Sequence, residues 1–144
     1  MDALTLPGTL DSLSKIRDYV HEMGEKAGLD RKTLYRLKLA VDEIATNIVT
    51  YGYEAAGLEG DIVILSNLQP SSLTIQLEDT SQECNPYEIE EPEHLKKPIN
   101  ERPIGGLGVF LAVRGVDEFR YERVNGRNLH TFMVKIPSSQ PQSS

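Results

Sequence analysis

The sequence of 144 residues has little cysteine, little basic charge and no long apolar run, and each shortage excludes a class of protein. Its single cysteine, Cys84, cannot build a disulfide framework or a cysteine-rich zinc site. The 22 acidic residues outnumber the 15 basic ones, and the net charge of −7 argues against a domain that binds nucleic acid directly. The longest apolar runs fall far below the roughly 18 residues that span a membrane, so no membrane association is expected.

The first residues also lack a basic stretch followed by an apolar one, so we expect no signal peptide and a cytoplasmic protein. A chain of this length is typical of one domain, and its 39% hydrophobic and 26% charged residues are globular values. We expect a single domain over residues 1–137. Residues 138–144, which are Ser, Pro and Gln, predict a disordered tail.

Two helices are predicted in the first half of the chain. Apolar residues recur every three or four positions over residues 10–23 and again over residues 34–48, which is helical spacing. Asp30 is placed to cap the second helix at its start, and Gly52 is expected to mark its end.

The rest of the sequence has the pattern of strands joined in hairpins. Asn125-Gly126 is the dipeptide most typical of a two-residue hairpin turn, and a longer turn is expected over residues 67–72. The predicted strands cover residues 4–6, 62–65, 73–77, 119–121 and 132–136. Because strands come as hairpins, we expect an α+β fold: a two-layer sandwich with a mostly antiparallel sheet and helices on one face.

Residues 80–104 form a long segment without periodic apolar positions and hold four of the eight prolines. Such a loop is uncommon in a compact domain unless it is functional. It leads into Gly105-Gly106-Leu107-Gly108 and a short helical stretch. Glycines let a backbone approach phosphates, and a helix start offers free amides to an anion, although the same residues also suit a flexible hinge. No Gly-Lys dipeptide occurs, which excludes a P-loop.

Three polar residues elsewhere suit chemistry, and each has a plainer alternative. Glu43 and Asn47 lie four residues apart on one helical face. A carboxylate there can act as a general base and an amide oxygen can bind Mg²⁺, but such a pair is also ordinary on a solvated helix. Asp79, at a strand end, can accept a hydrogen bond from the amine of a base or begin a turn. The histidines show no metal-type spacing and are expected to be solvated: His21, His94 and His130.

Taken in order, Glu43-x-x-x-Asn47, then Asp79, then Gly106-x-Gly108 resemble the N, G1 and G2 boxes of the GHKL (Bergerat-fold, histidine kinase-like) ATPases. Tyr51-Gly52-Tyr53 follows the first box, and Arg102-Pro103-Ile104-Gly105-Gly106-Leu107-Gly108 contains the last. With them the chain looks like the small anti-sigma factor serine/threonine kinases of the RsbW and SpoIIAB type. The resemblance covers nearly the whole chain, from about residue 4 to residue 136.

The resemblance implies a role for each matching residue. Glu43 would be the catalytic base that takes the proton from a serine or threonine hydroxyl of a protein substrate. Asn47 would bind the Mg²⁺ that bridges the phosphates of ATP, and Asp79 would bind the amino group of adenine.

The other implied ATP-binding positions are spread over the second half of the chain. The turn Gly106, Leu107, Gly108 would hold phosphates through its backbone amides, and Arg102 would lie near the γ-phosphate and offset its charge. Thr131 would lie near the adenine. Residues 80–104 would form a lid over the nucleotide.

Ser81 stands where these families usually have the glycine of the G1 box, and its side chain restricts the backbone. Two functions therefore stay open. The first is a homodimeric kinase that binds a sigma factor and, with ATP and Mg²⁺, phosphorylates an anti-anti-sigma (STAS-domain) antagonist. The second is a non-catalytic partner-switching module with weak or no nucleotide binding. The presence of Glu43 and Asn47 favours the first, because pure binding has no chemical need of them, whereas Ser81 favours the second.

Overall fold

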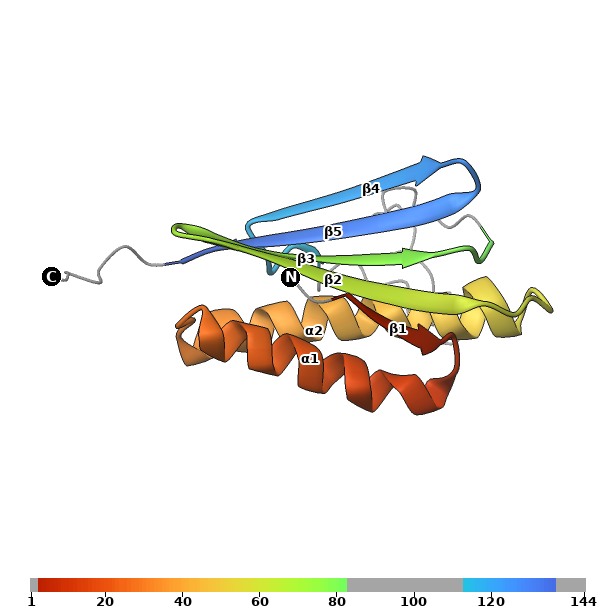
Figure 1. The fold of residues 1–144 in the computed structure, drawn as a ribbon, viewed down its shortest axis with the longest axis horizontal. Coiled ribbons are helices and arrows are strands. Elements are labelled where there is room, and N and C mark those ends of the chain that lie inside the picture. Colours follow the sequence, from red (N-terminus) through yellow and green to blue (C-terminus); the bar gives the residue numbers. More distant parts are fainter. Residues whose placement is uncertain (1–2, 83–112, 137–144) are drawn as a thin grey trace, which may run out of the picture.

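A computed structural model describes residues 3–82 and 113–136, and in these ranges it forms two layers (Figure 1). One layer is helical and the other is an antiparallel sheet, as the sequence predicts. The elements are β1 (Leu4–Pro7), the 3₁₀ turn η1 (Leu10–Ser12), α1 (Leu13–Lys26), α2 (Arg31–Asn47), the π-helix η2 (Ile48–Glu54), β2 (Asp61–Gln69), β3 (Ser72–Asp79), β4 (Glu118–Val124) and β5 (Arg127–Lys135).

The helical layer follows from local sequence. Asp30 caps α2, because its Oδ1 accepts a hydrogen bond of 2.7 Å from the backbone N–H of Thr33. The chain does not leave the helical path at Gly52, where the sequence predicted the end of this helix. It continues past Asn47 as η2, which runs to Glu54. None of the helices in the described part is long and apolar enough to cross a membrane.

The described strands form one sheet in the order β1-β2-β3-β5-β4, and every neighbouring pair is antiparallel. The turn between β2 and β3 is shorter than predicted: Gln69 already pairs with Ser72. Asn125 and Gly126 have φ angles of 52° and 78°, which is the left-handed pair that the tight β4–β5 hairpin requires.

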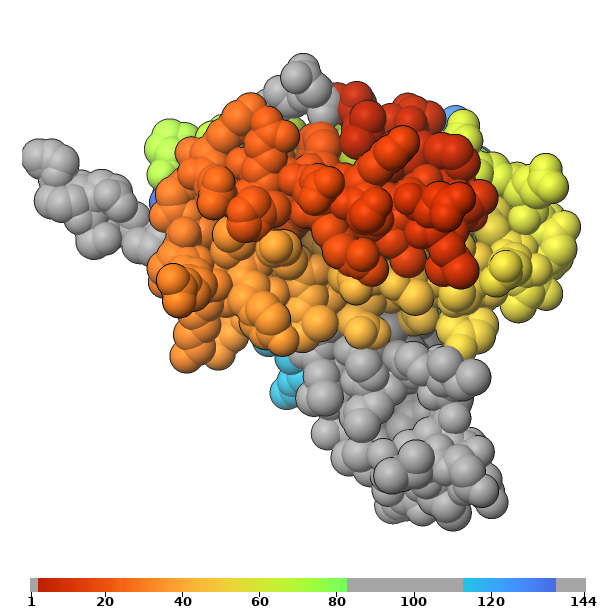
Figure 2. Space-filling view, turned by 90° about the horizontal axis from the view of Figure 1, so that it is seen from below, coloured from red at the N-terminus to blue at the C-terminus, as the bar shows by residue number. Residues whose placement is uncertain are grey.

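The hydrophobic core lies between the two layers. Alternate residues of β3 and β5 point toward the helices and are buried, from Leu73 to Asp79 and from Asn128 to Val134. Figure 2 shows the molecule from the helical side, where α1 and α2 lie next to each other. The helices thus cover one face of the sheet. The predicted tail, residues 138–144, lies outside the described residues.

Candidate functional site

Asp79, the residue expected to bind adenine, is the last residue of β3 and is buried, with 1% of its surface exposed. Its Oδ1 accepts hydrogen bonds from the backbone N–H of Ser81 (2.9 Å), the hydroxyl of Ser81 (2.5 Å) and Nδ2 of Asn128 (2.9 Å). Its Oδ2 has no hydrogen-bond partner among the described residues. A buried acceptor left unpaired is costly, so this oxygen is suited to accept a hydrogen bond from a bound ligand.

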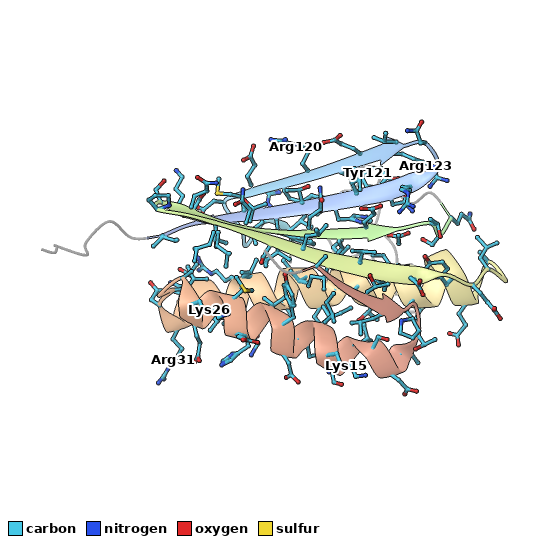
Figure 3. All side chains as sticks on the ribbon, viewed as in Figure 1. Lys15, Lys26, Arg31, Arg120, Tyr121 and Arg123 are labelled. Carbon is cyan, nitrogen blue, oxygen red and sulfur yellow. The ribbon has the colours of Figure 1, made fainter. Side chains whose placement is uncertain are left out.

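Asn128 lies opposite Asp79 in the β3–β5 register and connects three strands. Its Nδ2 also reaches the backbone oxygen of Ser81 at 3.2 Å. Its Oδ1 accepts hydrogen bonds from the hydroxyl of Tyr121 (2.6 Å) and from Nη1 of Arg123 (2.8 Å). Figure 3 labels both of these β4 side chains. Because both ends of the amide are engaged, Asn128 fixes the orientation of the Asp79 carboxylate.

His130 completes this group and, like Asn128, is a residue that the sequence analysis did not assign to the site. It was expected to be solvated, but it is buried, with 3% of its surface exposed. Its Nδ1 lies 3.9 Å from Oδ2 of Asp79, beyond hydrogen-bond range, and has no partner in the described ranges. Burial lowers the pKa of His130 to about 4, against the opposing effect of Asp79, so the ring is neutral at physiological pH. Asp79, Ser81, Asn128 and His130 are called the Asp79 cluster below.

Thr131, which is expected from the resemblance to lie near the adenine, is not brought to this cluster. It pairs with Gln76 across β3 and β5, and the side-chain amide of Gln76 donates to its hydroxyl at 3.2 Å. Successive residues of a strand point to opposite faces, so Thr131 lies on the face away from the helices. The inward positions of β5 next to Asp79 belong to Asn128 and His130.

Ser81, at the position of the usual glycine, packs its side chain against Gly52 of η2. A Cβ built on Gly52 would overlap the Ser81 hydroxyl and lie 2.7 Å from its Cβ. The backbone N–H of Gln82 also donates to the carbonyl of Gly52 at 3.1 Å. The absence of a side chain at Gly52 therefore makes room for the one at Ser81, whose hydroxyl then holds Asp79.

This contact leads to a prediction for the pair. Gly52→Ala is expected to destabilise the protein by about 1–3 kcal/mol, because the new methyl group overlaps Ser81. In the background of Ser81→Gly the same change is expected to cost clearly less, since the obstructing side chain is gone. Urea unfolding of the two single variants and the double variant measures the coupling. Additive effects of the two changes would contradict the contact.

The same contact brings the end of α2 toward the Asp79 cluster. Residues five apart are hydrogen-bonding neighbours in a π-helix, and Asn47 precedes Gly52 by five. The carbonyl oxygen of Asn47 lies 4.0 Å from the position of that added Cβ on Gly52. Asn47, at the last position of α2, is thus one helical turn from the residue that touches Ser81.

Glu43 lies one turn before Asn47 on α2 and is half-buried. Burial raises the pKa of its carboxyl group, and the neighbouring Asp42 carboxylate adds to this shift. A carboxylate with a raised pKa is a stronger base, which suits proton abstraction from a hydroxyl.

The remaining predicted site residues are not described by the structure. Arg102, Gly106, Leu107 and Gly108 fall in the range 83–112, outside the described residues, and stay predictions. Within residues 3–82 and 113–136, no group of three or more His, Cys, Asp or Glu side chains is placed to hold a metal ion.

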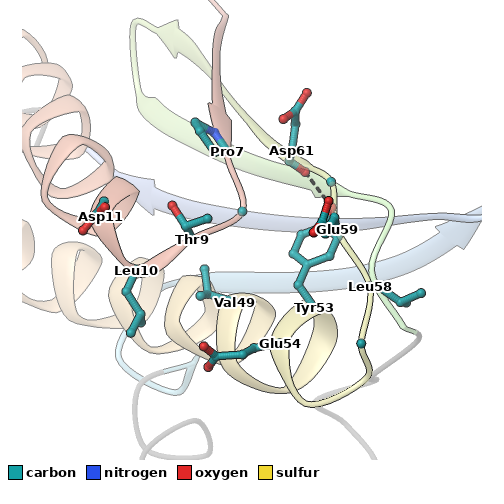
Figure 4. Close-up of a pocket in the computed structure, with 13 residues that line it drawn as sticks. Pro7, Thr9, Leu10, Asp11, Val49, Tyr53, Glu54, Leu58, Glu59 and Asp61 are labelled. Carbon is teal, nitrogen blue, oxygen red and sulfur yellow. Dashed lines mark hydrogen bonds between the residues drawn. The ribbon is translucent and has the colours of Figure 1, made fainter.

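A separate cavity of about 820 Å³ opens on the β1 side of η2 (Figure 4). Tyr53 lines it, and its hydroxyl donates to the carbonyl of Asp61 at 2.7 Å and accepts from the N–H of Thr80 at 3.0 Å. No predicted site residue lines this cavity. Its carboxylates would repel a triphosphate, so we do not assign the nucleotide to it: Asp11, Glu54, Glu59 and Asp61.

Comparison with protein families agrees with the fold and the order of the boxes. The family model described as the histidine kinase-like ATPase domain matches residues 6–135, most of the chain. The protein therefore belongs to the histidine kinase-like ATPase domain family, and the predicted Bergerat-type sandwich is confirmed.

Within that family the chain is similar to curated proteins named serine-protein kinase RsbW. It is 26% identical over 126 residues to the protein from Listeria innocua, which covers 81% of this chain and 76% of the relative. The RsbW of Bacillus mycoides is 24% identical over 120 residues, with 81% and 74% covered. The resemblance to the RsbW type is thus confirmed.

Two solved structures share the fold. The crystal structure of the RsbU and RsbW domains of a Mycobacterium tuberculosis protein superposes with a TM-score of 0.64 at 19% identity, over 94% of this chain and 33% of that one. The histidine kinase domain of a blue-light activated kinase from Erythrobacter litoralis gives 0.56 at 18% identity, over 89% and 60%. The chain spans about a third of the first structure, so this likeness concerns the architecture alone.

Proposed function

We propose that the protein is an ATP-dependent serine/threonine kinase that binds a sigma factor and phosphorylates a STAS-domain anti-anti-sigma antagonist. The observation that carries the proposal is Oδ2 of Asp79, a buried acceptor without a partner in the described part of the chain. Asn128 and Ser81 occupy the other carboxylate oxygen. The free oxygen therefore suits the amino group of adenine, in agreement with the family to which the chain belongs.

The residues on α2 then account for the transfer step. Glu43 takes the proton of the substrate hydroxyl, whose oxygen forms a bond to the γ-phosphorus while the bond from that phosphorus to the leaving ADP oxygen breaks. The amide oxygen of Asn47 would hold Mg²⁺, which would supply positive charge to neutralise the phosphates. In this proposal the base and the metal ligand lie one helical turn apart on α2.

Charge offers a reason for the release of the product. The protein has a net charge of −7, and a phosphoserine adds roughly −1.5 to −2 to the antagonist. Repulsion between the two would favour dissociation of the phosphorylated antagonist and leave the protein to bind its sigma factor. In this proposal the circuit operates in the cytoplasm, and the kinase acts as a homodimer.

Calorimetric titration with ATP, with and without Mg²⁺, tests the nucleotide site. We expect micromolar, Mg²⁺-dependent binding that is lost in Asn47→Ala and kept in Asn67→Ala, a control on β2. Saturating ATP should also raise the stability of the wild type by about 2.7 kcal/mol at a hundred times the dissociation constant. No binding at millimolar ATP would contradict the kinase and leave the non-catalytic partner-switching module as the function.

A further inference from the structure

Two buried polar atoms lie next to each other and both lack a hydrogen-bond partner in the described residues: Oδ2 of Asp79 and Nδ1 of His130. They come from neighbouring strands, β3 and β5, and lie 3.9 Å apart. The two residues are 1% and 3% exposed. Buried polar atoms are nearly always paired, so two unpaired ones at one place indicate that something else binds there.

The protonation of His130 decides what the pair can bind. Burial keeps the ring neutral, so one nitrogen carries a hydrogen and the other a lone pair. The nitrogen that faces the Asp79 carboxylate is Nδ1, and a hydrogen there is attracted by the negative charge, whereas a lone pair would be repelled. The pair therefore presents an acceptor, Oδ2, beside a donor, Nδ1–H.

Aromatic side chains of β4 hold the His130 ring in place. The ring centroid lies 5.1 Å from that of Tyr121 and 6.2 Å from that of Phe119. Tyr121 also donates its hydroxyl to Asn128, which in turn orients Asp79. One aromatic residue thus supports both halves of the pair, so donor and acceptor keep a fixed relation.

We propose that His130 is a specificity-determining residue of the nucleotide site, whose Nδ1–H donates to ring nitrogen N1 of adenine while Oδ2 of Asp79 accepts from the adjacent amino group. This inference rests on the proposed function. The edge with N1 and the amino group lies farthest from the ribose, so it is the edge that reaches a fully buried pair. Guanine has a carbonyl oxygen and an N1–H on that edge, and each would face a protein group of its own kind.

Binding of ATP analogues to the whole chain tests the inference by calorimetry. 1-Deaza-ATP lacks N1 and keeps the amino group, and we expect it to bind about fivefold to tenfold more weakly than ATP. 7-Deaza-ATP lacks the other neighbouring ring nitrogen and is expected to bind like ATP. GTP is expected to bind at least about a thousandfold more weakly, because buried polar groups would be left unpaired.

Variants of His130 give the second arm of the test. In His130→Phe the difference between ATP and 1-deaza-ATP is expected to disappear, because the donor is gone, whereas His130→Asn keeps a donor and is expected to retain part of it. Equal binding of the two nucleotides by the wild type would overturn the role of His130 and leave the nucleotide site intact. Absence of ATP binding to the wild type would overturn the nucleotide site itself. The wild-type comparison holds even if a variant fails to fold.

Discussion

Replacement of Glu43 with glutamine is expected to slow phosphotransfer about a hundredfold or more and to change ATP affinity less than about twofold. The amide keeps the size of the side chain but cannot take a proton, and general-base catalysis contributes roughly 10²–10⁴ to a rate. Transfer of radiolabelled γ-phosphate to a purified STAS-domain antagonist measures the first effect, and calorimetry measures the second. A Gln variant that transfers phosphate at the normal rate would show that another group is the base.

Asp42 provides the matched control, because it is adjacent to Glu43 and its Oδ1 accepts a hydrogen bond of 2.8 Å from Nε of Arg17 on α1. Asp42→Asn is expected to keep most of the activity at neutral pH. The active form of Glu43 is ionised, so the rate should fall as the pH drops through its raised pKa, above the ordinary 4.5. Removal of the Asp42 charge lowers the pKa of Glu43, and this fall should then move to lower pH.

Asn128→Asp is expected to destabilise the fold by about 3 kcal/mol at neutral pH. The oxygen that replaces Nδ2 would face Oδ1 of Asp79, 2.9 Å away in the wild type, and the carbonyls of Ser81 and Gln82 at 3.2 and 3.3 Å. The hydrogen bonds donated by Nδ2 would be lost, and buried negative groups would repel each other instead. Such a change is among the most destabilising in a protein core.

The cost of this change should depend on pH with a definite sign. Repulsion disfavours the charged form of the introduced carboxyl group, so its folded-state pKa lies above the unfolded value of about 3.9. The loss of stability is therefore full above the raised pKa and disappears as the pH falls toward the unfolded value. Urea unfolding should show that the difference in unfolding free energy between Asn128→Asp and the wild type is smaller at about pH 4.5 than at neutral pH. The control Asn67→Asp replaces an exposed residue of β2, and its unfolding free energy is expected to stay within about 0.5 kcal/mol of the wild-type value. A gap that does not change with pH would contradict the buried carboxylate pair.

Local signals in the sequence predict the helices and the hairpins well. The Asp30 cap and the Asn125-Gly126 turn involve neighbouring residues only, and both are present in the structure. The predicted end of the second helix was wrong because it depends on a contact between residues far apart in the sequence. Gly52 lies inside η2, where it contacts Ser81 from beyond β3, and no short-range pattern contains that contact.

The Asp79 cluster shows what family motifs leave out. The motif identifies Asp79 and the neighbouring Ser81, but Asn128, which also donates to Asp79, and His130, which lies beside it, come from β5, far away in the sequence. The strand parity was available in the sequence: Phe132 and Val134 are inward residues, and two steps of two back from Phe132 give His130 and Asn128. The signal for a site was that polar residues occupy inward positions of a strand whose other inward residues are apolar. Thr131, the residue next to His130, points to the opposite face of the sheet.

The edges of the sheet limit the ways in which a partner can bind. β1 is only four residues long and ends at Pro7, which has no N–H to donate. At the other edge, β4 alternates charge along its outer side through Glu118, Arg120 and Glu122. Short, proline-terminated or charged edges resist the addition of a further strand. A protein partner, such as the proposed sigma factor, antagonist or second copy of the chain, is therefore expected to dock through side chains on a face of the sandwich, and not by adding a strand to the sheet.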